Sequence, residues 1–509
     1  MTKYFDDSFK KIFHTKQKDI KTLLSDDMIL ISGDFWGIQK FIFEKLASKN
    51  ASKVIRAKSA FIQIYTEYIA KYICYRLDID ETYILNNTAG KFEILSPNKD
   101  RTILNDIQKK IDNYFLTNFY GLSGITICST ECIKNDFVST KAYKEFRNRV
   151  LKTVEIEKFK KFDLINQENF LIKYDKDIDN SSLCRICNIR KVEDENCNIC
   201  NVFIQLGKLL VKREQSIISS DTLQITIDNF LIDITIDKRL KFYVSKEDFD
   251  TPATFETLAN NSCEEGKGIK ALGILKADVD SMGKYLKESD ITENFENFEY
   301  FSHTLNNFFS LYIPIILKEK YPDTYTVFAG GDDLFLIGAW DEIVALAREI
   351  HQEFQTFIRN KLSISFGIVV VKPSYPVDRF AFVSEEMLEN AKAIDEDKNA
   401  ITLFGETVKW KSYLATFSKL NEAFKDLTLD ETKTAFLYRL LEVVELSKKV
   451  KYDNDIEATI WKSKLSYSFH RNMDAKYENL LKVLYEEIDM YPKESKIFLS
   501  EFIYKRRMV

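Results

Sequence analysis

The sequence predicts an α+β protein of several domains, built around two copies of one helix-backed antiparallel sheet. Three observations favour this class. The chain has 509 residues, too many for one compact core. The same order of apolar strands and amphipathic helices occurs twice, and the pattern after about residue 410 is helical to the end. We therefore expect five segments: an N-terminal segment 1–26, a first α/β domain 27–150, a linker domain 151–265, a second α/β domain 266–410 and a C-terminal helical bundle 411–509.

The composition is that of a soluble globular protein, with 45% apolar and 30% charged residues. No apolar run approaches the roughly 18 residues that span a bilayer, and the first residues, MTKYFDDSFKK, lack the apolar centre of a signal peptide. We expect a cytoplasmic protein without membrane contact. The net charge of −5 is unlike that of most freestanding nucleic-acid binders, so any nucleic-acid contact must be local or supplied by partner subunits.

The first copy begins with an apolar strand at 28–32, before Gly33–Asp34 and a helix. A helical apolar stripe follows in KVIRAKSAFIQIYTEYIAKYICYRL. The short strands TYILN and KFEIL then form a hairpin around Asn86–Gly90, and a helix over 100–118 and the strand GITICS complete the unit. The predicted order is β-α-α-β-β-α-β.

The second copy repeats this order. IKALGILKADVDSMGKYL is an apolar strand that ends in Asp278, then a turn and a helix, and ENFEYFSHTLNNFFSLYIPIILKEK is an amphipathic helix. TYTVFAGGDDLFLIG is a hairpin with Gly330–Gly331–Asp332–Asp333 at its tip, followed by the helix DEIVALAREIHQEFQTFIRN and the strand LSISFGIVVV. The first strand and the hairpin are 57 residues apart in one copy (Asp34 to Lys91) and 54 in the other (Asp278 to Asp332), which favours two sheets of palm type.

The carboxylates of Asp278, Asp332 and Asp333 are the candidate catalytic groups. Adjacent aspartates at a hairpin tip repel each other, and a divalent cation removes that repulsion; hard oxygen ligands suit Mg²⁺ or Mn²⁺. Gly330 and Gly331 let the backbone approach a bulky ligand. Two such ions would bridge the phosphates of a nucleotide and stabilise the leaving group. The alternative is a solvated turn without a ligand.

The first copy departs at this point, because Ala89–Gly90–Lys91–Phe92 stands where the second has Gly330–Gly331–Asp332–Asp333. Lys91 and Phe92 bind no cation, so we expect this copy to be catalytically silent. Gly90 and the basic residues Lys53, Arg56 and Lys58 would hold phosphates, or the basic residues are simply a solvated helix start.

Three further residues have more than one interpretation. Asp280 follows Asp278 by two positions, and we favour a helix N-cap over a metal ligand there. Lys392 and Lys398 lie near the second copy and would neutralise a triphosphate as point cations; on their own they are ordinary surface lysines.

Four of the eight cysteines form the pattern C-x2-C, nine residues, C-x2-C, at Cys184, Cys187, Cys197 and Cys200. This spacing is typical of a closed tetrahedral Zn²⁺ site with a structural role. A redox pair in each C-x2-C is the alternative, although neither precedes a helix in a thioredoxin-like context. The four histidines, at 14, 303, 351 and 470, include no His-Asp pair.

Six motifs in this order resemble the large polymerase-like subunit of type III CRISPR effector complexes, Csm type: SGDFWGIQKFIF, KVIRAKSAFIQIY, the cysteine cluster, KADVDSMG, FAGGDDLFLIG and KNAITLFG. The resemblance implies two ferredoxin-like palm domains of the polymerase and GGDEF-like cyclase type, a zinc-bearing linker domain and a C-terminal helical domain. It also implies conversion of ATP to cyclic oligoadenylate when guide and target RNA are bound. Implied partners are a small subunit and a subunit that binds the 5′ end of the guide.

By the same resemblance, Asp278, Asp332 and Asp333 bind the catalytic metals, and Gly330 and Gly331 shape the nucleotide site. Ser302 would contact the nucleotide and Lys392 its phosphates. Gly33 and Gly90 belong to the first palm, which would hold the second ATP of a composite site. Many members carry an N-terminal histidine-aspartate nuclease domain; this chain starts almost directly at the first palm, so we expect no single-stranded DNase activity.

The residues alone lead only to metal-dependent nucleotidyl transfer; the adenine base and activation by RNA come from the resemblance. Two other functions stay open. One is a non-catalytic scaffold subunit that keeps the GGDD turn as a relic, and the other is a freestanding GGDEF-like nucleotide cyclase.

Overall fold

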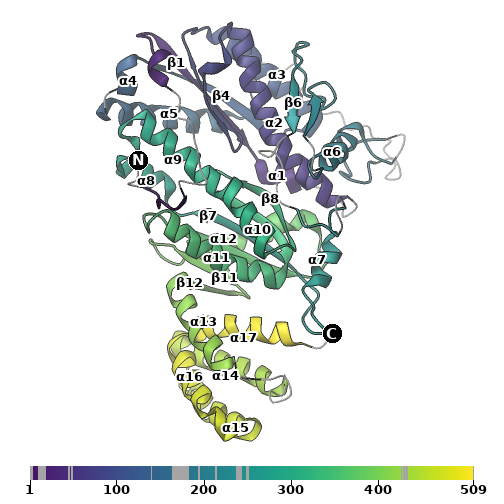
Figure 1. Ribbon diagram of the computed structural model, residues 1–509, viewed down its shortest axis with the longest axis vertical. Helices are drawn as coiled ribbons and strands as arrows, with labels where there is room; N and C mark the ends of the chain where they lie inside the picture. Colours follow the sequence, from purple (N-terminus) through teal and green to yellow (C-terminus); the bar gives the residue numbers. More distant parts are fainter. Residues whose placement is uncertain are drawn as a thin grey trace.

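The computed structural model describes residues 4–9, 19–43, 46, 50–138, 140–162, 183–192, 195–212, 215–236, 244–247, 251–425, 427 and 434–507. Figure 1 shows an elongated molecule in which one sheet with its helices occupies one end, a second sheet the middle, and a bundle of helices the other end. The described part of the chain contains no helix that could span a lipid bilayer.

The first sheet is antiparallel with the strand order β2-β3-β1-β4. Its strands are β1 (Met28–Trp36), β2 (Ile84–Thr88), β3 (Lys91–Ser96) and β4 (Gly124–Cys132). Its helices are α1 (Ile38–Phe43), α2 (Ala51–Leu77), α3 (Arg101–Phe119), α4 (Lys134–Val138) and α5 (Thr140–Lys160). The predicted element order is confirmed, but β1 is longer than expected, because Gly33 and Asp34 pair with both neighbouring strands. The expected boundary after residue 150 falls inside α5.

Local signals in the sequence delimit these helices. Asp100 begins α3 as an N-cap, with its side chain accepting hydrogen bonds from the backbone N–H of Thr102 (2.8 Å) and Ile103 (3.4 Å). Tyr120 ends α3 in the left-handed conformation. Helix α2 is buried along most of its length because it packs between the first sheet and the linker segment.

The second sheet has six strands in the order β12-β11-β10-β7-β9-β8. They are β7 (Leu272–Val279), β8 (Thr324–Gly330), β9 (Asp333–Ala339), β10 (Ile364–Val371), β11 (Ala400–Leu403) and β12 (Glu406–Lys409). Its helices are α8 (Met282–Glu288), α9 (Phe295–Asn307), α10 (Ile313–Lys320), α11 (Trp340–Phe357) and α12 (Phe380–Lys392). The order β8-β9-β7-β10 repeats β2-β3-β1-β4, so the two sheets share one connectivity.

Two features of the second unit differ from expectation. The helix predicted over ENFEYFSHTLNNFFSLYIPIILKEK is interrupted by a π-helical segment at Phe308–Tyr312, just before Pro314, whose ring removes one backbone donor. The hairpin β11–β12 was not expected, because strands of four residues carry too little alternation to be recognised.

The linker segment contains α6 (Asn198–Leu209), β5 (Ser216–Ser219), β6 (Asp233–Ile236) and α7 (Phe255–Asn261). The β-like pattern LQITIDNFLIDITI was misleading, since only its last four residues form a strand. Asp228 and Asn229 both have positive φ and break the extended run. Ile225 and Ile227 are buried, and the Ile227 N–H donates to the Tyr68 hydroxyl of α2 at 2.7 Å.

The C-terminal segment is helical, as expected, with α13 (Trp410–Phe424), α14 (Thr434–Asp453), α15 (Trp461–Asn472), α16 (Glu478–Met490) and α17 (Pro492–Arg506). The predicted apolar faces meet in one core that includes Leu440, Val444 and Leu484. Arg348 of α11 makes a bidentate ion pair with Glu501 of α17, at 2.7 and 3.0 Å, which ties the bundle to the second unit.

The two faces of the second sheet pack against different partners. Leu275, Ala277 and Leu336 face a core shared with α9 and α11, whereas Ile274, Phe335 and Ile337 belong to the core shared with the first unit. Phe43 of α1 packs on Phe335 with ring centroids 4.9 Å apart. The side chains of β7 and β9 on this second face therefore lie at the junction of the two units.

Candidate functional site

Asp278 and Asp333 lie directly opposite each other on the paired strands β7 and β9. Cross-strand partners share a sheet face, so both carboxylates point to the face that meets the first unit. Burial raises the pKa of Asp333 to about 8, and the neighbouring Asp278 and Asp332 contribute because like charges disfavour ionisation. The pair therefore retains a proton at neutral pH, and a bound cation would replace that proton and allow both carboxylates to ionise.

Asp332 occupies the turn between β8 and β9. Gly330 pairs with Asp333 to close the hairpin, and Gly331 has a φ of +65°, which favours glycine. The turn is fixed from outside by Asn306 of α9, whose Oδ1 accepts from the Gly331 N–H at 3.0 Å. Burial and Asp278 raise the pKa of Asp332, while Lys91 and Lys392 lower it.

The donor chemistry fits a hard divalent cation. Two facing carboxylates with a third one residue away present only oxygen ligands, as Mg²⁺ and Mn²⁺ require. Three carboxylates leave coordination positions open on an octahedral Mg²⁺, so the aspartates would share a cation with phosphate oxygens rather than enclose it alone.

The tip of the first hairpin faces the tip of the second. A Cβ placed on Gly330 would lie 3.4 Å from the Ala89 Cβ, and one on Gly331 would lie 3.5 Å from it. From the sequence, Lys91 aligns with Asp332, and the structure shifts this alignment of the two tips by one residue. Thr88 pairs with Lys91 as Gly330 pairs with Asp333, so Lys91 occupies the position of Asp333. The first hairpin thus offers a lysine where the second offers a carboxylate.

A cavity of about 380 Å³ lies beside these two tips. Its wall brings together six of the residues singled out from the sequence: Gly33, Ser302, Gly330, Gly331, Asp332 and Asp333. Lys91 of β3 lines the same cavity and acts electrostatically on Asp332, so the first unit contributes a positive charge to the site of the second. Gly90 is not part of this wall; it is buried against Phe35 and Ile62.

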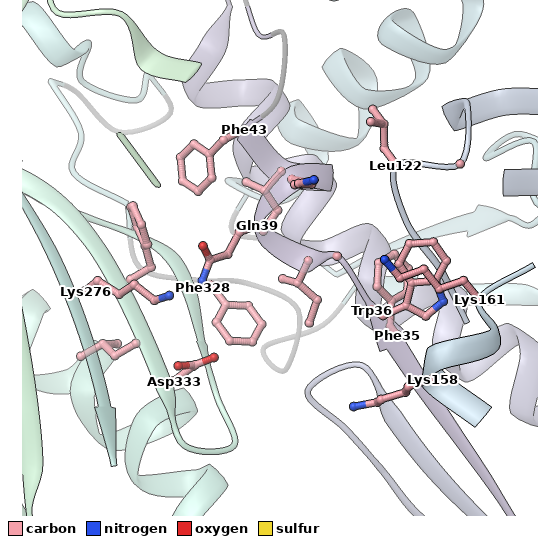
Figure 2. Close-up of a pocket in the computed structure, with 17 residues that line it drawn as sticks. Phe35, Trp36, Gln39, Phe43, Leu122, Lys158, Lys161, Lys276, Phe328 and Asp333 are labelled. Carbon is pink, nitrogen blue, oxygen red and sulfur yellow. The ribbon is translucent and has the colours of Figure 1, made fainter. Parts of the chain in front are cut away.

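A second cavity, of about 660 Å³, reaches Asp333 from the other side. In Figure 2, Lys276 and Asp333 enter it from the strands of the second sheet, with Gln39 and Phe43 of α1 across from them. Lys158 and Lys161 line its far side near Trp36. Both volumes lie in the range of small-molecule sites. The aromatic rings would accommodate a base and the lysines would neutralise phosphates.

Three residues of this site were missed from the sequence. Lys276 is 5% exposed, pairs with Glu385 of α12 and lowers the pKa of Asp333. Gln39 of α1 donates to the same Glu385 at 2.8 Å, which links the two units. Asn306 holds the turn. The sequence signalled one of these three residues: Lys276 lies two residues before Asp278, so the two side chains share a face of β7.

Other residues singled out earlier have structural contacts. Gly33 makes room for Phe92, since an added Cβ would lie 2.0 Å from its ring. Arg56 is only 2% exposed; its guanidinium donates to the Gly207 carbonyl of α6 and lies over the ring of Tyr325. Lys58 donates to the Ile42 carbonyl at 3.4 Å. Neither cavity at Asp333 is lined by Lys53, Arg56 or Lys58.

Lys392, the last residue of α12, forms an ion pair with Asp278. The N-cap interpretation of Asp280 is wrong. Helix α8 begins after Ser281, which has a φ of +54°, and the Asp280 carboxylate points instead toward β10. Its Oδ2 accepts from the hydroxyls of Ser363 (2.7 Å) and Ser365 (3.0 Å) and from the Asn399 N–H (3.1 Å).

His351 supports this network from α11. Its Nε2 lies 2.9 Å from Oδ1 of Asn399, and its ring stacks on Trp410 with centroids 4.4 Å apart. Burial lowers the pKa of His351 to about 4. The unfolded chain takes up this proton near pH 6.5, so the stabilisation from the neutral ring is complete above that pH and is lost as the pH falls toward 4.

We expect acidification from pH 7.5 to 5.0 to remove about 2 kcal/mol of unfolding free energy through His351. His351→Gln should lack this component, so its stability should fall correspondingly less than that of the unmodified chain. His470→Gln, at an exposed position, is the matched control and should behave like the unmodified chain. Denaturant titrations at both pH values measure the difference, and equal losses in all three proteins would contradict the assignment.

The four cysteines form a compact buried cluster. The sulfurs of Cys184, Cys187, Cys197 and Cys200 all lie within 4.8 Å of one another, as tetrahedral ligands at about 2.3 Å from a zinc ion would. Arg190 lies beside them, with its guanidinium 3.6 Å from the Cys187 sulfur and 3.8 Å from that of Cys197. Its positive charge suits a cluster of thiolates, so these residues fit Zn²⁺.

Comparisons with known proteins find similar sequences and similar folds. A family model described as Cas10/Cmr2, second palm domain, matches residues 271–402, and one described as Csm1 subunit domain B matches residues 27–177. The CRISPR system single-strand-specific deoxyribonuclease Cas10/Csm1 (subtype III-A) of Methanocaldococcus jannaschii is 28% identical over 80% of this chain and 62% of its own length. The chain thus spans about six-tenths of that relative.

Two solved structures share the fold. The apo Csm1–Csm4 cassette superposes with a TM-score of 0.70 at 21% identity, covering 94% of this chain and 70% of that chain. A Csm1–Csm4 cassette in complex with cA4 gives a TM-score of 0.68 at 20% identity, with the same two coverages of 94% and 70%.

Proposed function

We infer from this chain's homology to the Cas10/Csm1 subunits of subtype III-A CRISPR systems that it is the large subunit of an RNA-guided effector complex and joins ATP molecules into cyclic oligoadenylate. The observation that carries this proposal is that Asp332 and Asp333 line a cavity shared by two similar units, while Asp278 lies directly opposite Asp333 on the neighbouring strand. The solved neighbour with cA4 supports the product class.

In this proposal the second unit is a palm domain that carries the chemistry. Asp278, Asp332 and Asp333 would hold Mg²⁺ or Mn²⁺. Divalent ions held there would activate the attacking hydroxyl and stabilise the departing pyrophosphate. Gly330 and Gly331 leave the backbone open to the triphosphate, and Ser302 on α9 lines the same cavity at the position expected to contact the nucleotide.

The first unit would act as a second palm that holds the other nucleotide. Lys91 at its hairpin tip cannot bind a cation, but its ammonium faces Asp332 across the cavity and suits a phosphate. Lys276 and Lys158 line the larger cavity and are paired with Glu385 and Asp34, so each would exchange its carboxylate partner for a phosphate oxygen when a nucleotide binds. Two nucleotides placed in the two cavities would thus meet at the paired tips, with one offering its hydroxyl and the other its α-phosphate.

The remaining segments would hold the site and its partners. Zn²⁺ on the four cysteines would stabilise the start of α6, which packs on α2. The C-terminal helices and the linker are proposed to contact the small subunit, the subunit that binds the guide 5′ end, and the RNAs.

The test is synthesis by the assembled complex. We expect the chain, purified with its partner subunits and guide RNA, to convert ATP and Mg²⁺ into cyclic oligoadenylates when a complementary target RNA is added, as detected by mass spectrometry. Omitting the target RNA should remove most of the product. A complex that binds target RNA but yields no oligoadenylate would contradict the proposal.

The same reactions can contain labelled single-stranded DNA. The relatives are named for a deoxyribonuclease activity, whereas we expect none from this chain. That expectation stays a prediction, and cleavage of the DNA by the complex would show it to be wrong.

A further inference from the structure

Two carboxylates at the end of β7, those of Asp278 and Asp280, lie near the same lysine, Lys392 of α12. Asp280 lies in the turn just after β7, and its carboxylate accepts from Ser365, the cross-strand partner of Asp278 on β10, so the two carboxylates lie on the same side of the sheet. This is the side on which α12 packs. Lys392, at the end of α12, pairs with Asp278 and also interacts electrostatically with Asp280.

Asp280 has an unused oxygen. The residue is 3% exposed, and its Oδ2 already accepts three hydrogen bonds, from Ser363, Ser365 and Asn399. Its Oδ1 is buried and has no hydrogen-bond partner among the described residues. An unpartnered buried carboxylate oxygen is costly, so Oδ1 is a ready acceptor for a cation that comes within reach.

The backbone around Asp280 keeps this oxygen in place. The Val279 N–H donates to the Asp332 carbonyl at 3.1 Å, and the Asp280 N–H donates to the Ser363 carbonyl at 2.8 Å. The segment is therefore held on one side by the catalytic turn and on the other by the chain entering β10. The lysine side chain, by contrast, is long and has four rotatable carbon–carbon bonds.

We propose that Lys392 has two positions: it occupies Asp278 until a divalent cation takes that carboxylate, and its ammonium then moves to Oδ1 of Asp280. This inference rests on the proposed metal site at Asp278. Lys392 is a positioning residue here, and Asp280 receives its charge when the cation binds. No covalent bond changes and no proton is transferred.

The two-position lysine has a consequence for metal binding. Since the ammonium and the cation compete for Asp278, removing the ammonium should strengthen cation binding. Since Asp280 accepts the displaced ammonium, removing its charge should weaken cation binding, but only while Lys392 is present. If Lys392 only neutralised phosphates, neither replacement would change the cation affinity in the absence of nucleotide.

The experiment measures Mn²⁺ binding to the full chain without nucleotide, from the electron paramagnetic resonance signal of free Mn²⁺. The proteins are the unmodified chain, Asp278→Ala, Lys392→Met, Asp280→Asn and the double variant Lys392→Met/Asp280→Asn. We expect Lys392→Met to bind Mn²⁺ roughly tenfold more tightly and Asp280→Asn roughly threefold to tenfold more weakly, the range of coupling between contacting residues. In the Lys392→Met background, the Asp280→Asn change should have less than about a third of that effect.

The outcomes separate the alternatives. If Asp280→Asn weakens Mn²⁺ binding equally in both backgrounds, Asp280 acts on the cation directly and the inference is overturned. Lys392→Met with unchanged or weaker Mn²⁺ binding overturns it as well, even if Asp280→Asn does not fold. If Asp278→Ala leaves Mn²⁺ binding intact, the proposed metal site itself fails; if Asp278→Ala abolishes binding while Lys392→Met has no effect, only the two-position lysine fails.

Discussion

Asp333→Asn is expected to lower the rate of oligoadenylate synthesis by at least about a hundredfold, the loss typical when one charge-stabilising group is removed from an active site. Asparagine keeps the shape of the side chain but cannot carry the negative charge that faces Asp278 across β7 and β9. The change also removes the like-charge repulsion in the pair, so the folded chain should not be destabilised. The measurement is the initial rate of product formation by the RNA-bound complex.

The matched control is Asp341→Asn. Burial raises the pKa of Asp341 as it does that of Asp333, but Asp341 lies at the start of α11 and lines neither cavity. Its replacement should leave the rate within about twofold, as surface and non-site changes generally do. Equal rates for Asp333→Asn and the unmodified complex would remove Asp333 from the chemistry.

Cys200→Ser is expected to lower the zinc affinity of the chain by at least about a hundredfold, because even the outer partners of metal ligands are worth 10–100-fold. The hydroxyl is a poor replacement for a thiolate in a tetrahedral four-cysteine site. Loss of the ion should loosen α6, since structural zinc supplies folding free energy directly. Metal analysis of the purified protein and hydrogen exchange of α6 measure the two effects.

Cys263→Ser is the control, because Cys263 lies outside the cluster and is partly exposed. It should keep about one zinc ion per chain and the full protection of α6. The loosening of α6 should extend to Arg56, which donates to the Gly207 carbonyl of α6 and packs on Tyr325 of β8. A Cys200→Ser chain that retains its zinc would show that the cluster has another purpose.

The repeat and the acidic positions were predictable because local patterns encode them. Strands of seven or eight residues with apolar faces surround Asp278 and Asp333, and glycines mark the turn between β8 and β9. The turn fixes the register of β8 against β9, and the sequence predicted that the strand ending in Asp278 pairs with this hairpin; the exact partner of Asp278 depends on how β7 packs against β9. The cysteine cluster was predictable for the same reason, since its ligands lie within 17 residues of one another.

The remaining parts of the site depend on packing between units, which no local pattern encodes. Lys91 faces the second unit because the two hairpin tips meet, and Gln39 does so because α1 packs against α12. Asp280 lies two residues after Asp278 and just before a helix, which is where an N-cap is expected. Hydrogen bonds from Ser363 and Ser365, which are distant in sequence, instead decide the orientation of its carboxylate. Asp228 and Asn229 likewise break a run that reads as a strand, because both accept positive φ more readily than other residues.

The most direct test of the central claim is a structure of the complex with Mn²⁺ and a non-hydrolysable ATP analogue, with the manganese located by anomalous scattering. We expect the anomalous peak beside Asp278, Asp332 and Asp333, in contact with the triphosphate of a nucleotide whose base lies in the cavity lined by Ser302. Manganese and nucleotide bound elsewhere, with these three carboxylates contacting neither, would contradict the account.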